Sequence, residues 1–179
     1  MSKPVFSVMF VAALAFAGAA KAADCAPVYA AGTKQAATPY RASVVTSDVT
    51  LPPGLSPALS PARITDMVYD GQALYLMIGG KWISRPMTPQ MQLAQIAENK
   101  KRGHAVCARL ADSAVDGEAA AVYTTHDQMP EGTADTKIWI SKKTGLPLRS
   151  DVRIALHPGG QTTSARFHYG PVKRPPGVK

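Results

Sequence analysis

Side chains that could carry out acid–base or metal chemistry are few and widely spaced in this chain. Its four histidines are His104, His126, His157 and His168. His104 and Cys107 are three residues apart, but the surrounding residues predict a strand, on which such positions point to opposite faces. Because the ligands of a metal must converge on one point, we expect no metal site at this pair.

The acidic residues form no catalytic motif either. Asp112, Asp116 and Glu118 flank a predicted turn, where we expect them to be solvated. The chain contains no nucleophile elbow, phosphate-binding glycine loop or zinc-type spacing. Acid–base pairs can also assemble from distant strands, so an enzyme remains an alternative. We predict a non-catalytic protein that needs no cofactor.

The two cysteines, Cys25 and Cys107, predict a structural disulfide. Their spacing is unlike the Cys-x-x-Cys of thiol catalysts. An even number of cysteines in an exported chain favours pairing. The bond would close a loop of 81 intervening residues, and the loop-entropy relation gives it about 4–5 kcal/mol as an upper value.

The N-terminus has the pattern of a secretory signal peptide. Lys3 precedes an apolar run over residues 5–20, and Ala20-Lys21-Ala22 supplies small residues for cleavage before Ala23. A transmembrane anchor is the alternative, but a spanning helix needs about 20 apolar residues, more than this run contains. We therefore predict a periplasmic protein whose first 22 residues are removed.

The remaining residues, 23–179, are predicted to form a single domain with a Pro-rich C-terminal tail. Removal of Lys3 and Lys21 lowers the formal net charge from +8 to +6. The basic residues are scattered, and exported proteins rarely meet nucleic acid, so nucleic acid is not an expected partner. A weak contact with an anionic membrane surface is the one function we retain for this charge.

Most of the chain alternates between apolar and polar residues, as strands do. The stretch "KIWISKKTGLPLRSDVRI" (137–154) predicts two strands joined by a tight turn, and Asp70-Gly71 and Gly79-Gly80 predict two more hairpins. The expected strands are 40–51, 63–69, 73–78, 81–84, 104–110, 118–126, the two of the hairpin within 137–156, and 162–172. Four prolines at 52–61 predict a loop.

Two helices are expected. An Ala-rich segment begins near Asp24 and Pro27 and ends before Pro39. In "MTPQMQLAQIAENKKRG" (87–103), Thr88 can cap the helix, three basic residues suit its last turn and Gly103 can end it. Its apolar arc, Met91, Leu93, Ala94, Ile96 and Ala97, predicts the face that lies on the sheet, with Gln92 and Gln95 opposite.

These elements predict an α+β fold: one curved antiparallel sheet, an incomplete barrel, with helices packed on its concave face. A sheet of about eight strands curls under its own twist, so a half-barrel is expected rather than a flat slab.

The hairpin segments "YLMIGGKWISRPM" and "IWISKKTGLPLRSDV", with the closing strand "SARFHYGPVKRP", resemble the superfamily of LolA-like periplasmic proteins. The similarity covers roughly residues 26–172 and is greatest to small uncharacterised members. It implies a half-barrel with an apolar concave face, helices that act as a lid, and a bound acyl chain or similar ligand. The Asp24-Cys25 pair departs from the lipid-attachment box of the membrane-anchored members. No functional residue can be transferred from the superfamily.

Large apolar residues on the predicted strands and on the second helix are the candidate ligand-binding residues. They are Leu76, Ile78, Trp82, Met91, Ile138, Ile140, Val152, Ile154, Phe167 and Tyr169. An ordinary packed core is the simpler interpretation of each of them. The alternative is that the many alanines on the strands, as in "EAAAVY", leave an apolar cavity between sheet and helices.

Two function hypotheses follow, beside the enzyme. The first is a periplasmic carrier of a hydrophobic ligand, such as an acyl chain, a lipoprotein anchor or a lipid-like molecule. Methionines on several elements would suit an adaptable apolar surface. The second is an interaction or sensor module for an envelope protein, with the same fold and a filled core. A bound lipid distinguishes the two.

Overall fold

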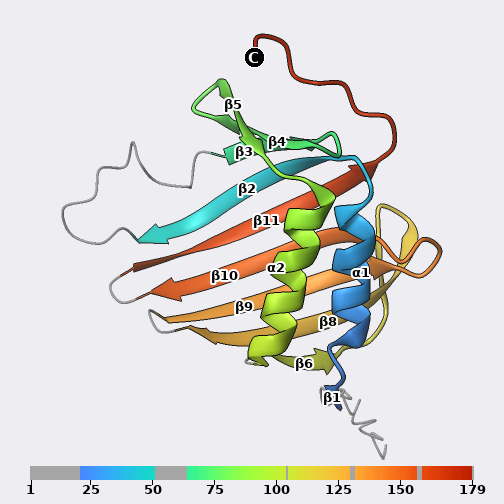
Figure 1. Ribbon diagram of the computed structural model, residues 1–179. Helices are drawn as coiled ribbons and strands as arrows, with labels where there is room; N and C mark the ends of the chain where they lie inside the picture. Colours follow the sequence, from blue (N-terminus) through green and yellow to red (C-terminus); the bar gives the residue numbers. More distant parts are fainter. Residues whose placement is uncertain (1–20, 51–63, 104, 130–131, 157–158, 179) are drawn as a thin grey trace, which may run out of the picture.

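A computed structural model describes residues 21–50, 64–103, 105–129, 132–156 and 159–178 (Figure 1). The predicted signal peptide, except for its last two residues, and the predicted Pro-rich loop at 52–61 lie outside these ranges. Among the described residues, no helix is long and apolar enough to cross a membrane.

Eleven antiparallel strands form one sheet. They are β1 (Lys21–Ala23), β2 (Tyr40–Thr50), β3 (Ile64–Tyr69), β4 (Ala73–Ile78), β5 (Lys81–Pro86), β6 (Ala105–Arg109), β7 (Ser113–Val115), β8 (Glu118–Met129), β9 (Gly132–Ser141), β10 (Pro147–Leu156) and β11 (Gly159–Tyr169). Their order is β1-β6-β8-β9-β10-β11-β2-β3-β4-β5, and β7 pairs with β8 beside this path. In the described part of the chain β1 and β5 do not pair with each other, so the sheet is open.

The two helices lie over the same face of this curved sheet (Figure 1). Helix α1 spans Ala26–Ala36, and α2 spans Pro89–Arg102. Thr88 caps α2 by accepting a hydrogen bond from the Met91 N–H at 3.3 Å, as predicted. Gly103 ends α2 with a φ of 65°, a left-handed conformation that glycine adopts without strain. Helix α1 begins close to Asp24, as predicted: Cys25 is its N-cap residue, and Asp24 accepts a hydrogen bond from the Ala26 N–H.

The prediction of an α+β class is corrected to mostly β. Two helices of 11 and 14 residues accompany strands of which β8–β11 are 10 to 12 residues long. Two short strands, β1 and β7, are additional to the predicted set. Three residues are too few to show the alternation from which strands are recognised in a sequence.

The strand register defines which residues face the helices. Residues directly opposite each other on neighbouring strands share a face, and Tyr40 is opposite Tyr69 on one side and Tyr169 on the other. Since the Tyr69 hydroxyl donates to the carbonyl oxygen of Ala36 in α1 at 2.9 Å, this set faces the helices. We call this side the helix face and the other side the opposite face.

A second apolar cluster lies on the opposite face. Ala120, Val122 and Trp139 are buried there, with Leu110, Val115 and Leu148 packed against them. The Trp139 ring lies between two cations: Lys137 Nζ is 4.8 Å and the Arg149 guanidinium carbon 4.7 Å from its centroid. These contacts cover an aromatic side chain that would otherwise meet water on the bare side of the sheet.

The predicted disulfide is present. Cys25, at the start of α1, is bonded to Cys107 on β6, and their Cα atoms are 5.3 Å apart. The bond ties the N-terminal end of α1 to the β6 end of the sheet. Such bonds are typical of proteins that fold outside the cytoplasm.

Candidate functional site

Eight of the ten candidate residues lie on the helix face. On β9–β11 these are Ile138, Ile140, Val152, Ile154, Phe167 and Tyr169, and on β4 they are Leu76 and Ile78. Trp82 is opposite Met77, which alternates with Leu76, so Trp82 lies on the opposite face. Met91 is on α2, with 53% of its surface exposed. The structure therefore brings most, but not all, of the candidates to one side of the sheet.

The end of the helix face beneath α1 is filled by aromatic side chains. Tyr40 contacts the rings of Tyr69 and Phe167, both with centroids at 5.5 Å, and that of Tyr169 at 6.1 Å. The Tyr169 hydroxyl donates to the Pro147 carbonyl at 2.7 Å and accepts from the Gln35 amide at 3.2 Å. Two of the candidates, Phe167 and Tyr169, thus belong to a packed, hydrogen-bonded core.

Burial governs the ionisation of this cluster. Burial, with a smaller contribution from Tyr69, raises the pKa of Tyr40 to about 12. Burial likewise raises the pKa of Tyr169, since an ionised phenol is poorly solvated in an apolar site. Leu76 and Ile140 are also buried, at 8% and 7% exposure. Buried side chains thus fill much of this end of the helix face.

The half of the helix face that lies away from the aromatic cluster differs, because it is lined by small side chains. We call it the far half. One cross-strand row runs over six neighbouring strands from the disulfide to β2: Cys107, Thr125, Thr136, Val152, Thr163 and Thr46. We call these residues the threonine row. The Thr46 and Thr163 hydroxyls lie 3.5 Å apart. Ile138 and Ile154 flank the row, and both are half-buried.

The threonine row is long enough to hold a linear ligand. Neighbouring strands are about 4.8 Å apart, so five spacings give a row of about 24 Å. Its side chains are short and expose methyl groups beside hydroxyls. Threonine and valine side chains occupy less of the space above the sheet than bulky residues would, and the inner hollow described below lies over Cys107, Thr125 and Thr136.

Helix α2 does not close this space. None of its fourteen residues is buried, and Leu93 and Met91 are 40% and 53% exposed. The helix contacts α1 through Ile96, which lies against Gly32. The predicted arc is correct at Ile96, which is half-buried, and wrong at Met91, Leu93, Ala94 and Ala97, which are exposed. Gln92, predicted on the opposite side, is half-buried. Gln92 lies near Tyr69 under the helix, and its Nε2 is buried without a hydrogen-bond partner among the described residues. Burial raises the pKa of Tyr69.

A hollow lies at the β6 end of the threonine row. This inner hollow has a volume of about 170 Å³ and is lined by α1, α2 and the sheet through Cys25, Val28, Tyr29, Asn99, Ala105, Cys107, Thr125, Asp127, Ala134 and Thr136. It therefore contains three members of the row and the disulfide. Asp127 is its one acidic residue.

An outer hollow of about 550 Å³ adjoins the inner one. Its lining residues are Asp24, Cys25, Ala26, Tyr29, Lys100, Gly103, Ala105, Val106 and Cys107. The two hollows share the disulfide, Tyr29 and Ala105. The outer hollow has the size of a small-molecule site, and Lys100 is the basic residue among its lining residues.

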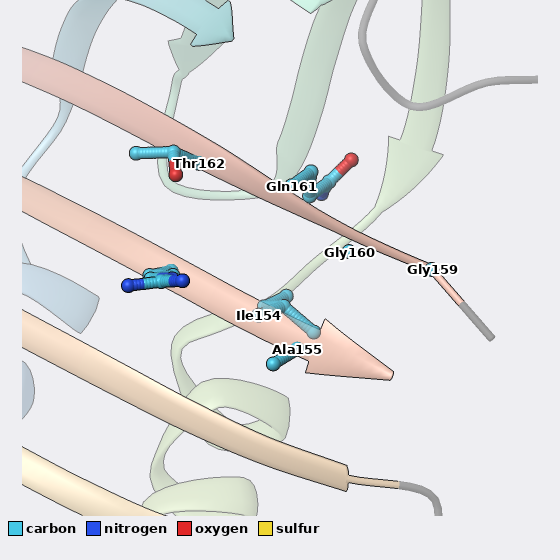
Figure 2. A pocket seen from close by; sticks show the side chains of 7 residues that line it. Ile154, Ala155, Gly159, Gly160, Gln161 and Thr162 are labelled. Carbon is cyan, nitrogen blue, oxygen red and sulfur yellow. The ribbon is translucent and has the colours of Figure 1, made fainter. Parts of the chain in front are cut away.

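A third hollow, of about 310 Å³, lies at the far ends of β10 and β11 (Figure 2). Ile154, Gln161 and Thr162 line it together with the Gly159-Gly160 pair. A Cβ at Gly160 would meet the Ile154 carbonyl oxygen at 2.6 Å, so the close approach of the two strands requires glycine there. Ile154 thus connects this hollow to the far half of the helix face.

The described part of the chain contains one histidine–carboxylate pair, His126 Nδ1 and Asp135 Oδ1 at 2.6 Å, which is exposed on the opposite face of the sheet. Its His, Cys, Asp and Glu side chains form no group of three that could hold a metal ion. The acidic residues of the predicted turn are paired: Asp112 with Arg109 and Lys142, Asp116 with Arg166, and Glu118 with the Ser141 hydroxyl. Hydrogen bonds from Lys142 and Arg109 lower the pKa of Asp112.

The residues that sequence reasoning missed are Tyr29, Asn99, Lys100 and the threonines of the row. Bulky apolar residues were the predicted signal, but the open part of the face consists of small and polar ones. The "YTTH" segment on β8 gives only a weak indication of the row. It contains two adjacent threonines, and the alternation of a strand places one of them on each face. Only the register assigns Thr125 to the helix face and Thr124 to the opposite face.

Comparison with known proteins gives a distant structural likeness and no family match. No family model and no curated protein matches the chain. Among solved structures, the crystal structure of a DUF1329 family protein from Desulfovibrio piger is similar over 79% of this chain and 89% of that chain, at 10% identity. The TM-score is 0.28, and a likeness at this level contributes nothing to the assignment of a function.

Proposed function

We propose that this protein is an exported, non-catalytic binder of a hydrophobic ligand, namely an acyl chain, a lipoprotein anchor or a lipid-like molecule. The ligand would lie between the sheet and α2 along the threonine row. In this proposal the open sheet is a half-barrel in the periplasm, with the helix face as its concave side. The resemblance of the two hairpins to the LolA-like superfamily points in the same direction.

The observation that most supports this proposal is the incomplete contact between α2 and the sheet. An amphipathic helix is normally stabilised by burying its apolar side, yet none of the residues of α2 is buried. Small side chains form the floor below it, and Ile138, Val152 and Ile154 around this floor are only half-buried. An apolar ligand between the two layers would bury these surfaces, at roughly 25 cal/mol per Å².

Native mass spectrometry of the protein purified from its own periplasm without detergent tests the proposal. The expected result is a discrete added mass that solvent extraction releases as an apolar compound. An unliganded mass, with no uptake of fatty acid or fluorescent lipid added afterwards, would contradict it.

A second candidate, an interaction module for an envelope protein, is favoured by the filled aromatic end of the helix face. Tyr40, Tyr69, Phe167 and Tyr169 pack as an ordinary core does. If the protein binds no apolar compound, crosslinking in intact cells and identification of one specific envelope protein would support this candidate.

A further inference from the structure

We infer that the ligand is a single linear acyl chain with an anionic head, and that the head is bound in the outer hollow beside Lys100. This inference rests on the proposed function and adds the class of ligand and its direction. The chain would run from the outer hollow past Tyr29 and the disulfide, through the inner hollow, and along the threonine row.

The first argument is the length of the path. One leaflet of a bilayer is half of the roughly 30 Å hydrocarbon core, about 15 Å, and a membrane acyl chain spans it. The threonine row, at about 24 Å from five strand spacings, is longer than this. A whole acyl chain therefore fits along it without folding back. A compact, multi-ring ligand would not use a path that crosses six strands in one line.

The second argument is the position of the charged side chains at the two hollows. Lys100 lines the outer hollow, and Lys101 and Arg102 follow it at the exposed end of α2. Asp24 also lines the outer hollow, and its Oδ1 accepts the Ala26 N–H at 3.0 Å. The outer hollow thus has a cation beside its carboxylate, whereas the lining of the inner hollow has Asp127 and no cation. The ammonium of Lys100 is therefore the group that an anionic head would meet there.

The third argument fixes the direction of the chain. Asp127 lines the inner hollow, and its carboxylate would repel an anionic head in a site with reduced solvent. The outer hollow is open to water beside a cation, so the charged head is stable there and the uncharged chain enters. Reversing the chain would place the head against Asp127 or at the far end of the row.

Isothermal titration calorimetry with three ligands of equal chain length tests this inference. These are dodecanoate, dodecan-1-ol and dodecylammonium, each titrated below its aggregation concentration at pH 7.5. We expect dodecanoate to bind about fivefold more tightly than the alcohol, as suits a partly exposed ion pair, and the ammonium compound to bind most weakly. In Lys100→Glu this order should disappear or reverse.

Lys101→Glu is the matched control. It makes the same charge change on the next residue of α2, with the same unfavourable effect on the helix dipole, but Lys101 does not line the outer hollow. It should keep the preference for dodecanoate. Circular dichroism of both variants checks that α2 is retained.

The outcomes separate the inference from the proposed function. Equal affinities for the three ligands, or equal effects of the two variants, would overturn the anionic head and leave hydrophobic binding standing. No binding of any of the three would overturn both. Competition with lysophosphatidylglycerol identifies the source of the head group. If this lipid displaces bound dodecanoate and the displacement depends on Lys100, the ligand is a phospholipid. If dodecanoate binds and the lipid does not displace it, the ligand is a free fatty acid.

Discussion

The guanidinium of Arg174 lies 2.8 Å from the carboxylate of Asp70, 104 residues earlier in the chain. The same carboxylate accepts hydrogen bonds from the Tyr75 hydroxyl at 3.1 Å and from the N–H groups of Gln72 and Ala73 at 2.9 Å. Only 13% of the Asp70 side chain is exposed. Asp70 therefore shapes the β3–β4 turn and holds the C-terminal segment against it.

This arrangement predicts a loss of stability in acid. Burial alone would raise the pKa of Asp70, but hydrogen bonds from Arg174, Ala73, Gln72 and Tyr75 outweigh it and lower the pKa to about 2. An unfolded aspartate titrates near 3.9. The stabilisation is thus complete above about pH 4 and is lost as the pH falls towards 2. Urea unfolding between pH 5 and pH 2 measures it.

Asp70→Asn should remove this part of the pH dependence and lower the free energy of unfolding by about 1–3 kcal/mol, because a buried acceptor of charge-assisted bonds is lost. Asp66→Asn is the control, since its partner Arg41 is 60% exposed and surface pairs contribute little. An unchanged acid profile in Asp70→Asn would contradict the prediction.

Removal of the disulfide should destabilise the protein strongly. The Cys25→Ser/Cys107→Ser variant is expected to lose about 2–5 kcal/mol, because the unfolded chain is no longer constrained by a long closed loop. Urea unfolding of the wild type with and without reductant provides the comparison. Two free thiols in the oxidised wild-type protein, by mass spectrometry, would refute the bond itself.

A charge at Ile140 should have a different effect from a charge at Ile154. Ile140 is buried, so Ile140→Asp is expected to prevent folding, as does an unpaired charge in a core. Ile154 is half-buried and lines a hollow, so Ile154→Asp should fold and lose ligand uptake. Circular dichroism and a lipid-uptake assay separate these results. A folded Ile154→Asp with normal uptake would exclude this part of the face from the site.

Filling the floor of the inner hollow should block the ligand. Thr125→Phe places a ring where the proposed chain passes, and fluorescent-lipid uptake should fall at least tenfold. Thr124→Phe makes the same change one residue earlier on β8, on the opposite face, and uptake should persist. If the two variants behave alike, the ligand does not lie along the threonine row.

Export and processing are predicted to leave a protein that begins at Ala23. The intact mass of the periplasmic protein measures this directly. Cleavage there would remove Lys21 and Ala22, which pair with Arg109 and Ala108 in β1 and β6. A mass that includes residues 1–22 would show that the N-terminal segment is retained.

The sequence was sufficient to predict most elements but not the site. Strand β4 was predicted at its observed bounds, Ala73–Ile78, and α2 was predicted with its cap at Thr88 and its end at Gly103. These features are local, since alternation, capping and glycine turns each depend on a few neighbouring residues. The pairing of β2 with β11 depends on residues 129 positions apart, such as Tyr40 and Tyr169, which no local pattern connects.

The same distinction explains why a core residue could not be told from a cavity residue in the sequence. Phe167 and Tyr169 looked like cavity residues, but the distant Gln35 and Tyr40 fill the space around them. Hydrophobicity predicts that a residue is turned inward, not whether another part of the chain already occupies that interior. The open part of the face became visible only when the register brought the threonines into one row.

The pairing of β2 with β11 has a consequence for synthesis and export. In the sheet order of the described residues, β2–β5 lie on one side of β11, and β1 and β6–β10 lie on the other, so β11 connects the two groups of strands. A chain still being synthesised lacks this connecting strand until residues 159–169 have been made. Pairings between such distant strands also form slowly. For the proposed export this late completion is favourable, because a precursor that lacks β11 cannot form the full sheet before translocation.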